Sequence, residues 1–173
     1  AGAPAVRIGK KGRQVEVAPD GRGVRVSGDG TALGDSVLEQ DAAYWEVEVL
    51  GLGAGDGGAA ACQIGVCHDR GGASLDAPLG AGEGCWTVGL GPGELSQGDV
   101  VGVACGKGNV PNLEFYLNGR LLDGPSVKRI TGDAFPAVSV AGGAAVLMVF
   151  REACFKHTPP GSCQQIIPAA GML

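Results

Sequence analysis

Short runs in which apolar and polar residues alternate recur along most of this chain, and they constrain its fold more than any other feature. Gly, Pro, Asp and Asn separate nearly all of them, at the spacing typical of a β-sandwich. No segment longer than ten residues has a convincing helical period. We therefore expect an all-β protein, an antiparallel sandwich of two sheets. Its strands should lie in the segments RQVEVAP, GVRVSG, YWEVEVL, CQIGVC, WTVGL, DVVGVAC, NLEFYL, FPAVSVA and AVLMVF.

The segment NLEFYLNGRLL, residues 112–122, contains the clearest turn. Asn118 and Gly119 tolerate the positive φ that a two-residue type I′ turn requires, so the pair predicts a β-hairpin. Leu121 and Leu122 begin the return strand. The simplest interpretation of this hairpin is architectural, a surface turn without an activity of its own. Alternation assigns one face of the incoming strand to the core, and this face holds Leu113, Phe115 and Leu117.

Alternation also predicts which side chains of the other strands are buried. In the segment 44–49 we expect the apolar face to be the buried one, opposite a face that carries two carboxylates. The near-continuous apolar run at 100–104 is suited to a central strand. In the segment 44–49, the face predicted to be buried holds Trp45, Val47 and Val49, and the opposite face holds Tyr44, Glu46 and Glu48. In the segment 62–67, Cys62, Ile64 and Val66 share one face, and Cys67 lies on the other.

Length and composition set the broad class of the protein. A chain of 173 residues fits a single domain, with a core at about 6–160 and a C-terminal extension at 161–173. Its 33 glycines show no Gly-X-Y period and 45% of residues are apolar, which excludes collagen and argues against disorder. A net charge of −5 disfavours nucleic-acid binding. No apolar run approaches the ~20 residues of a membrane helix and no charged-then-apolar run opens the sequence, so we expect neither a membrane helix nor a signal peptide in it.

The cysteines and the glycine motifs do not predict a cofactor or a metal. Most of the six cysteines sit in or beside strand-like runs, as small buried hydrophobes do, which favours a reduced, cytoplasmic setting over a disulfide framework. The chain contains a match to GxGxxG, the glycine pattern of dinucleotide-binding sites. Its glycines lead into another strand rather than a helix, so they do not form such a site. Gly106-Lys107 lacks the flanking residues of a phosphate-binding loop. The GxGxxG glycines are Gly53, Gly55 and Gly58.

The candidate catalytic groups are few. Cys67, His68 and Asp69 supply a nucleophile, a base and an acid, but residues adjacent in a strand rarely face one another. His157 follows Cys154 by three residues, and nothing completes a zinc site around them. We therefore expect no catalytic and no metal-binding residues. Asp99 is expected to be a structural turn acid that accepts backbone N–H bonds.

Five segments in register resemble the SPRY domain family, and APLG (77–80) and HTPPG (157–161) resemble its small, single-domain branch. The resemblance implies a bent, concanavalin-like jelly-roll sandwich that binds protein partners through loops at one rim, without catalysis. Peptide-binding members carry an aromatic residue where this chain has Ala141, Gly142 and Gly143, which favours a broader, flatter contact or the use of a different rim here. The matching segments are YWEVEV (44–49), QIGVC (63–67), GDVVGVACG (98–106), LEFYLNGRLL (113–122) and FPAVSV (135–140).

Three functional hypotheses follow. The first is a protein-interaction module whose long loops at 68–84 and 123–133 carry the binding surface. The second is a structural subunit of a large cytoskeletal or ciliary assembly. The third is a cysteine-dependent hydrolase or a carbohydrate-binding sandwich. For the first hypothesis, the candidate partner-binding residues are Asp69, Arg70, Leu79, Trp86 and Lys107.

Overall fold

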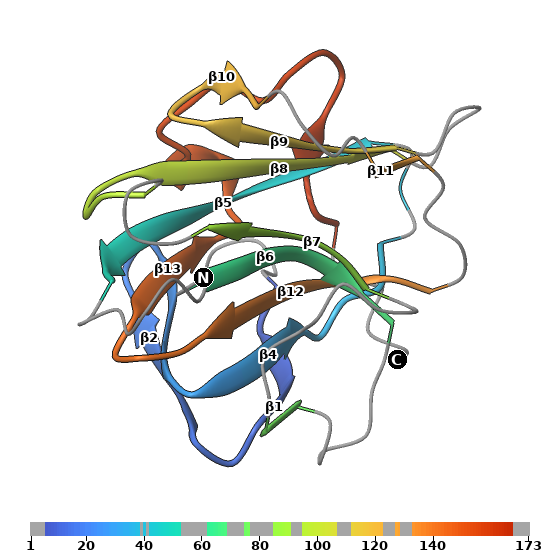
Figure 1. The fold of residues 1–173 in the computed structure, drawn as a ribbon. Helices are drawn as coiled ribbons and strands as arrows, with labels where there is room; N and C mark the ends of the chain where they lie inside the picture. Colours follow the sequence, from blue (N-terminus) through green and yellow to red (C-terminus); the bar gives the residue numbers. More distant parts are fainter. Residues whose placement is uncertain are drawn as a thin grey trace.

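The computed structural model describes residues 6–38, 40, 42–52, 62–68, 75–76, 85–90, 95–106, 112–122, 127–128 and 133–167, apart from the side chains of 85–86, 89–90, 112 and 127–128. This part of the chain folds into two β-sheets that pack face to face, and its helical content is limited to short 3-10 turns such as η2 (Glu152–Cys154) (Figure 1). The predicted all-β sandwich is therefore confirmed.

The two sheets differ in size. The five-stranded sheet has the order β1 (Ile8–Lys11), β4 (Gly30–Gly34), β12 (Phe135–Val140), β6 (Cys62–Cys67) and β7 (Cys85–Leu90). The nine-stranded sheet has the order β10 (Arg120–Leu121), β9 (Asn112–Leu117), β8 (Val100–Gly106), β5 (Ala42–Gly51), β13 (Ala145–Val149), β3 (Gly23–Gly28) and β2 (Val15–Asp20). In addition β11 (Val127–Lys128) pairs with β9, and β14 (Gln164–Gln165) pairs with β5 in parallel.

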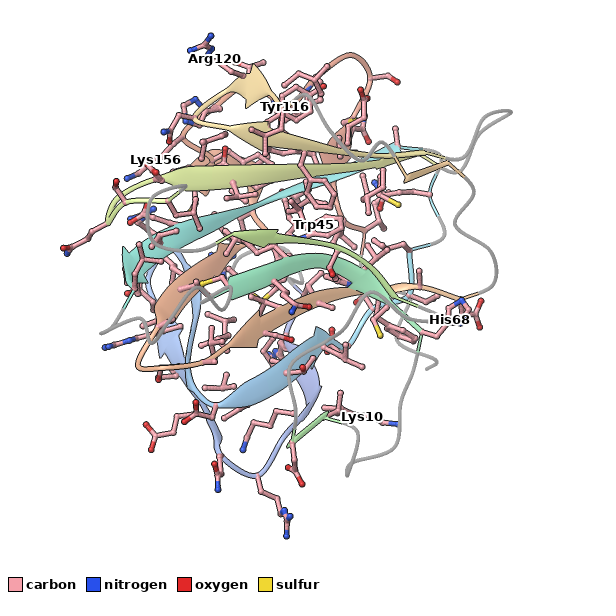
Figure 2. The ribbon with its side chains drawn as sticks, viewed as in Figure 1. Lys10, Trp45, His68, Tyr116, Arg120 and Lys156 are labelled. Carbon is pink, nitrogen blue, oxygen red and sulfur yellow. The ribbon has the colours of Figure 1, made fainter. Side chains whose placement is uncertain are left out.

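The core lies between the two sheets, and most of its side chains sit at the alternating positions that the sequence predicts. Trp45 lies between the layers and is fully buried (Figure 2). β8 is paired on both sides and buried on both faces, as a central strand should be. On β6 the predicted inward set belongs to the main cluster, while Cys67 faces outward and packs in a smaller cluster. The residues of that smaller cluster are Leu33, Cys67, Leu75 and Ala137.

The burial predicted for β5 is only half correct. Trp45, Val47 and Val49 are in the core as expected, yet the opposite face is buried as well. Tyr44 and Glu46 expose 2% and 1% of their surface, because the chain after β13 turns back across the outer face of the nine-stranded sheet. We call residues 150–167 the C-terminal strap. It ends in β14, which occupies the edge of β5 that β13 leaves free.

Strand β4 was not among the predicted strands, although it is paired on both sides and buried along its whole length. Its sequence, GTALG, has no alternation because both of its faces are covered. Gly30 has a φ of +132°, and a side chain there would collide with the carbonyl of Leu75. The segment around Leu75 and Asp76 thus packs directly on the sheet, and the side chain of Arg13 fixes it by an ion pair of 3.0 Å with Asp76.

Candidate interaction surface

Pairing in the five-stranded sheet defines two opposite ends of the sandwich. Val140, at the end of β12, pairs with Cys62, and Phe135, at its start, pairs with Cys67. The turn 141–143 therefore lies at the end of the strands opposite to the end where β6 leads into His68. In the other sheet, Ala145 pairs with Gly51, whereas Gly106 pairs with the first residue of β5.

The sequence-predicted partner-binding residues fall outside what the structure describes. This holds for Asp69, Arg70, Leu79 and Lys107, and for the side chain of Trp86, whose backbone belongs to β7 and pairs with Val66. The described residues that precede Asp69 and Lys107 in the chain, His68 and Gly106, lie at the same end of the sandwich. The turn 141–143 lies at the other end, so strand order does not bring it together with these strand ends.

The turn between β12 and β13 is small and exposed. Gly142 and Gly143 have φ angles of +65° and +86°, which side-chain-bearing residues rarely adopt. The N–H of Gly142 donates to a carboxylate oxygen of Asp29 at 3.2 Å, and the N–H of Ala144 donates to the carbonyl of Ala141 at 3.2 Å. This turn thus offers exposed backbone at the position where the family resemblance implies a stacking aromatic side chain.

The predicted hairpin turn is confirmed and is held rigidly at its base. Asn118 and Gly119 have φ angles of +51° and +87°, as a type I′ turn requires. The side chain of Asn118 accepts from the N–H of Val100 at 2.9 Å and donates to the carboxylate of Asp99 at 3.1 Å. Asp99 also accepts from the N–H of Ser96 at 2.8 Å, so it is the structural turn acid that the sequence predicts. These bonds fix the hairpin tip against the start of β8.

The return strand of this hairpin exposes aliphatic surface. Leu121 is 52% exposed, although Leu122 beside it packs against the core. The hairpin borders a pocket of about 410 Å³, lined by Leu117, Asn118, Arg120, Leu121 and Leu122. The sequence pattern of the hairpin predicts an architectural role alone. A signal was nevertheless present, because two successive leucines on one strand point to opposite faces and cannot both enter the same core.

A buried carboxylate joins the C-terminal strap to β5. Glu46 accepts hydrogen bonds from the hydroxyl of Tyr44 at 2.8 Å, from the N–H of Lys156 at 2.7 Å and from the N–H of His157 at 3.1 Å. Burial, followed by the bond to Glu46, raises the pKa of Tyr44 far above its ordinary value. The ring of Phe155 meets Tyr44 edge-on at 5.0 Å. Because Glu46 is fully engaged in positioning the strap, this cluster is structural.

A second carboxylate on the same face forms two ion pairs. Glu48 lies 2.5 Å from the guanidinium of Arg22 and 2.8 Å from the ammonium of Lys156. The hydrogen bond from Arg22, which outweighs burial, lowers the pKa of Glu48 below its ordinary value, and Lys156 adds to the effect. Figure 2 shows Lys156 and Arg120 on the side of the molecule away from His68. The strap and the hairpin therefore place cations along one side of an acidic protein.

The triplet Cys67-His68-Asp69 does not present its cysteine for catalysis. Cys67 is fully buried and packs among Leu33, Leu75 and Ala137. Burial also raises the pKa of the Cys62 thiol to about 11. His157 lies on the strap, where its Nδ1 is 3.0 Å from the position that a Cβ at Gly119 would take. Among the described residues, no three His, Cys, Asp or Glu side chains are grouped so that they could hold a metal ion.

The sandwich is similar to several solved SPRY and NHR domains. The NHR domain of Neuralized from Drosophila melanogaster matches with a TM-score of 0.63 at 9% identity, covering 86% of this chain and 94% of that one. The PSpry domain of TRIM65 gives 0.58 at 12% identity, covering 84% and 89%. A human SPRY domain gives 0.53 at 18% identity, covering 77% and 94%. The chain therefore has the SPRY-like β-sandwich fold.

Two other comparisons find no counterpart for this chain. No protein-family model matches it, and no curated protein matches it in sequence. The likeness to SPRY and NHR domains consequently concerns the fold.

Within the part of the chain that the structure covers, no helix has the length and apolar character to span a membrane.

Proposed function

We propose that this chain is a non-catalytic protein-interaction module that binds a protein partner through the rim of a rigid sandwich. The observation that carries the proposal is the hairpin tip at Asn118 and Gly119. Hydrogen bonds to Asp99 and Val100 fix the tip, and it presents the exposed side chain of Leu121. A pre-ordered apolar surface of this kind binds a protein at a low entropic cost.

The chemistry of the described ionisable groups supports a binding function. Glu46 and Glu48 are engaged in bonds that hold the C-terminal strap, and Cys67 is packed in an apolar cluster. A general base or nucleophile needs access to a substrate, which these groups lack. The SPRY-like fold supports the same proposal by analogy alone, because proteins that share a fold can differ in function.

Site-specific crosslinking tests the proposal. A photoreactive amino acid would be placed singly at Leu121 and Ala141, on the rim, and at Glu16, an exposed position on edge strand β2, as the control. We expect the rim positions to crosslink a defined set of proteins in native extract, with competition by unlabelled protein. Equal labelling from all three positions, or no competable product from any, would refute the interaction function. Size-exclusion of the crosslinked extract then distinguishes a transient module from a stable subunit of a large assembly.

A further inference from the structure

We propose that β10 is a docking edge for an extended, acidic segment of a partner protein, which adds to the nine-stranded sheet beside Arg120 and Leu121. The inference rests on the proposed interaction function and names the chemistry of the partner. It concerns the outer edge of the hairpin, for which the sequence pattern predicts an architectural role alone.

Among the described residues, no strand pairs with the outer edge of β10. There β10 is the last strand in the order of its sheet, and β9 is its one partner. The N–H of Leu122 donates to the carbonyl of Phe115 at 2.8 Å, so Leu122 belongs to a hydrogen-bonded pair. Because such pairs alternate along an antiparallel ladder, the N–H and C=O of Leu121 point away from β9. An extended peptide could therefore form backbone hydrogen bonds with Leu121.

The side chains around this edge supply apolar contact on both faces. Leu121 is directly opposite Tyr116, so the two side chains share the outer face of the sheet, and Tyr116 is half-buried there. Leu117 and Leu122 lie on the other face together with Arg120, which pairs with Leu117, and the pocket of about 410 Å³ is bordered by these residues and by Leu121. Alternate residues of an added strand would thus contact Leu121 with Tyr116 on one face, and Arg120 with the two leucines on the other.

The local charge selects an acidic partner. Arg120 is exposed and points away from the sandwich, and no carboxylate of the described residues forms an ion pair with it (Figure 2). Asp99, the acid that is hydrogen-bonded to the hairpin tip, already accepts from Ser96 and Asn118. Within the described residues, a chain with a net charge of −5 thus presents a guanidinium without an ion-pair partner next to its exposed leucine. Arginine binds carboxylates in two parallel hydrogen bonds, which favours Asp or Glu in the added segment.

A second copy of this chain fits the edge less well. Two-fold pairing of so short a strand would bring the Arg120 residues of both copies close together, and each copy carries a net charge of −5. Charge repulsion therefore opposes self-association at β10 and favours a segment from a different protein.

Peptide display with the whole chain as bait tests the proposal. A library of random twelve-residue peptides would be selected on the wild type, and fluorescence anisotropy would measure the affinity of enriched peptides. We expect sequences that alternate aliphatic residues with Asp or Glu. Arg120→Glu should weaken their binding at least tenfold, and exchange of the peptide's acids for Lys should restore binding to that variant. Leu121→Lys should weaken binding similarly. The matched controls Arg25→Glu and Ile167→Lys, at exposed positions, should leave affinity within twofold.

Amide hydrogen exchange locates the bound segment. Bound peptide should slow exchange of the Leu121 N–H at least tenfold. A selection without enriched acidic peptides, or binding that leaves both Leu121 exchange and the Arg120→Glu affinity unchanged, would overturn the docking edge. Binding elsewhere on the rim, seen in the same exchange data, would overturn only this inference. The proposed interaction function fails separately, when crosslinking from the rim yields no competable partner.

Discussion

The hydroxyl of Tyr44 donates a 2.8 Å hydrogen bond to the carboxylate of Glu46, two residues further along the same face of β5. The same carboxylate accepts the backbone N–H groups of Lys156 and His157. The C-terminal strap, 110 residues further along the chain, thereby covers a face of β5 that the sequence predicts to be polar. The position of the C-terminal strap depends on this one side chain.

Replacement of Glu46 should therefore destabilise the protein more than loss of any single donor. In Glu46→Gln, an NH₂ group must face at least one of the three donors that the carboxylate accepts. We expect a loss of about 2–3 kcal/mol in the free energy of unfolding, measured by urea denaturation. Tyr44→Phe removes one donor and leaves Glu46 with two, so it should cost only about 1 kcal/mol. Equal effects of the two variants would contradict a central role for the carboxylate.

The ion pairs of Glu48 should make stability depend on pH. Its folded-state pKa lies below the ordinary value of 4.5, mainly because Arg22 donates a hydrogen bond to it. A lowered folded pKa means that the unfolded chain binds the proton more readily. The contribution of Glu48 is thus complete well above pH 4.5 and is lost as the pH falls through the folded-state pKa.

Denaturation of the wild type and Glu48→Gln at several pH values checks this expectation. The stability difference between the two proteins should be present at pH 7 and should shrink steadily below pH 4.5, toward the folded-state pKa. High salt should reduce it as well, because Arg22 and Lys156 are partly exposed. A difference that stays constant down to pH 3 would show that Glu48 acts through packing.

The strands that could be predicted are those whose pattern is local. In NLEFYLNGRLL, alternation and the Asn-Gly pair lie within a few residues, so the sequence predicted both the hairpin and its inward face. The same holds for the inward set on β6. GTALG, in contrast, is buried on both faces by strands far away in the chain, and a short glycine-bounded run carries no sign of that. Its assignment required knowledge of tertiary packing.

The burial of Tyr44 and Glu46 could not be predicted for the same reason. A strand with tyrosine and two glutamates on one face is typical of a sheet that is solvated on that side. Burial here depends on a strap whose own sequence has little regular pattern. For the binding surface, the SPRY resemblance predicted rim loops whose residues the structure does not describe, so those assignments remain predictions. The exposure of Leu121 could be anticipated from the pair Leu121-Leu122, whereas its position on an edge strand required the sheet order.

The hairpin turn should tolerate a change at Asn118 better than one at Gly119. Gly119 has a φ of +87°, and a Cβ there would lie 3.0 Å from Nδ1 of His157. Gly119→Ala therefore strains the backbone and crowds the strap, and should destabilise the protein by more than about 1 kcal/mol. Asn118→Gly keeps the turn but loses the side-chain bonds to Asp99 and Val100, at a cost of about 1 kcal/mol.

Thermal and urea unfolding of both hairpin variants provides the measurement. Gly98→Ala is a useful control, because Gly98 also has a positive φ, +92°, but a Cβ there meets no neighbouring atom. The difference between Gly119→Ala and Gly98→Ala isolates the contact with His157. Identical losses in the two variants would show that backbone conformation alone determines the cost at Gly119.

The packing of Gly102 against Tyr44 should couple β8 to the strap. A Cβ at Gly102 would lie 2.5 Å from the hydroxyl of Tyr44 and about as close to its ring, which is buried and cannot move freely. Gly102→Ala should therefore displace the hydroxyl from Glu46 and destabilise the protein by about 2–3 kcal/mol, through overpacking and a weakened hydrogen bond. In a Tyr44→Phe background the same substitution has no hydroxyl to displace, so its cost should fall by about 1 kcal/mol. A double-mutant cycle of unfolding free energies measures this coupling, and strictly additive losses would show that Gly102 does not act through the Tyr44–Glu46 bond.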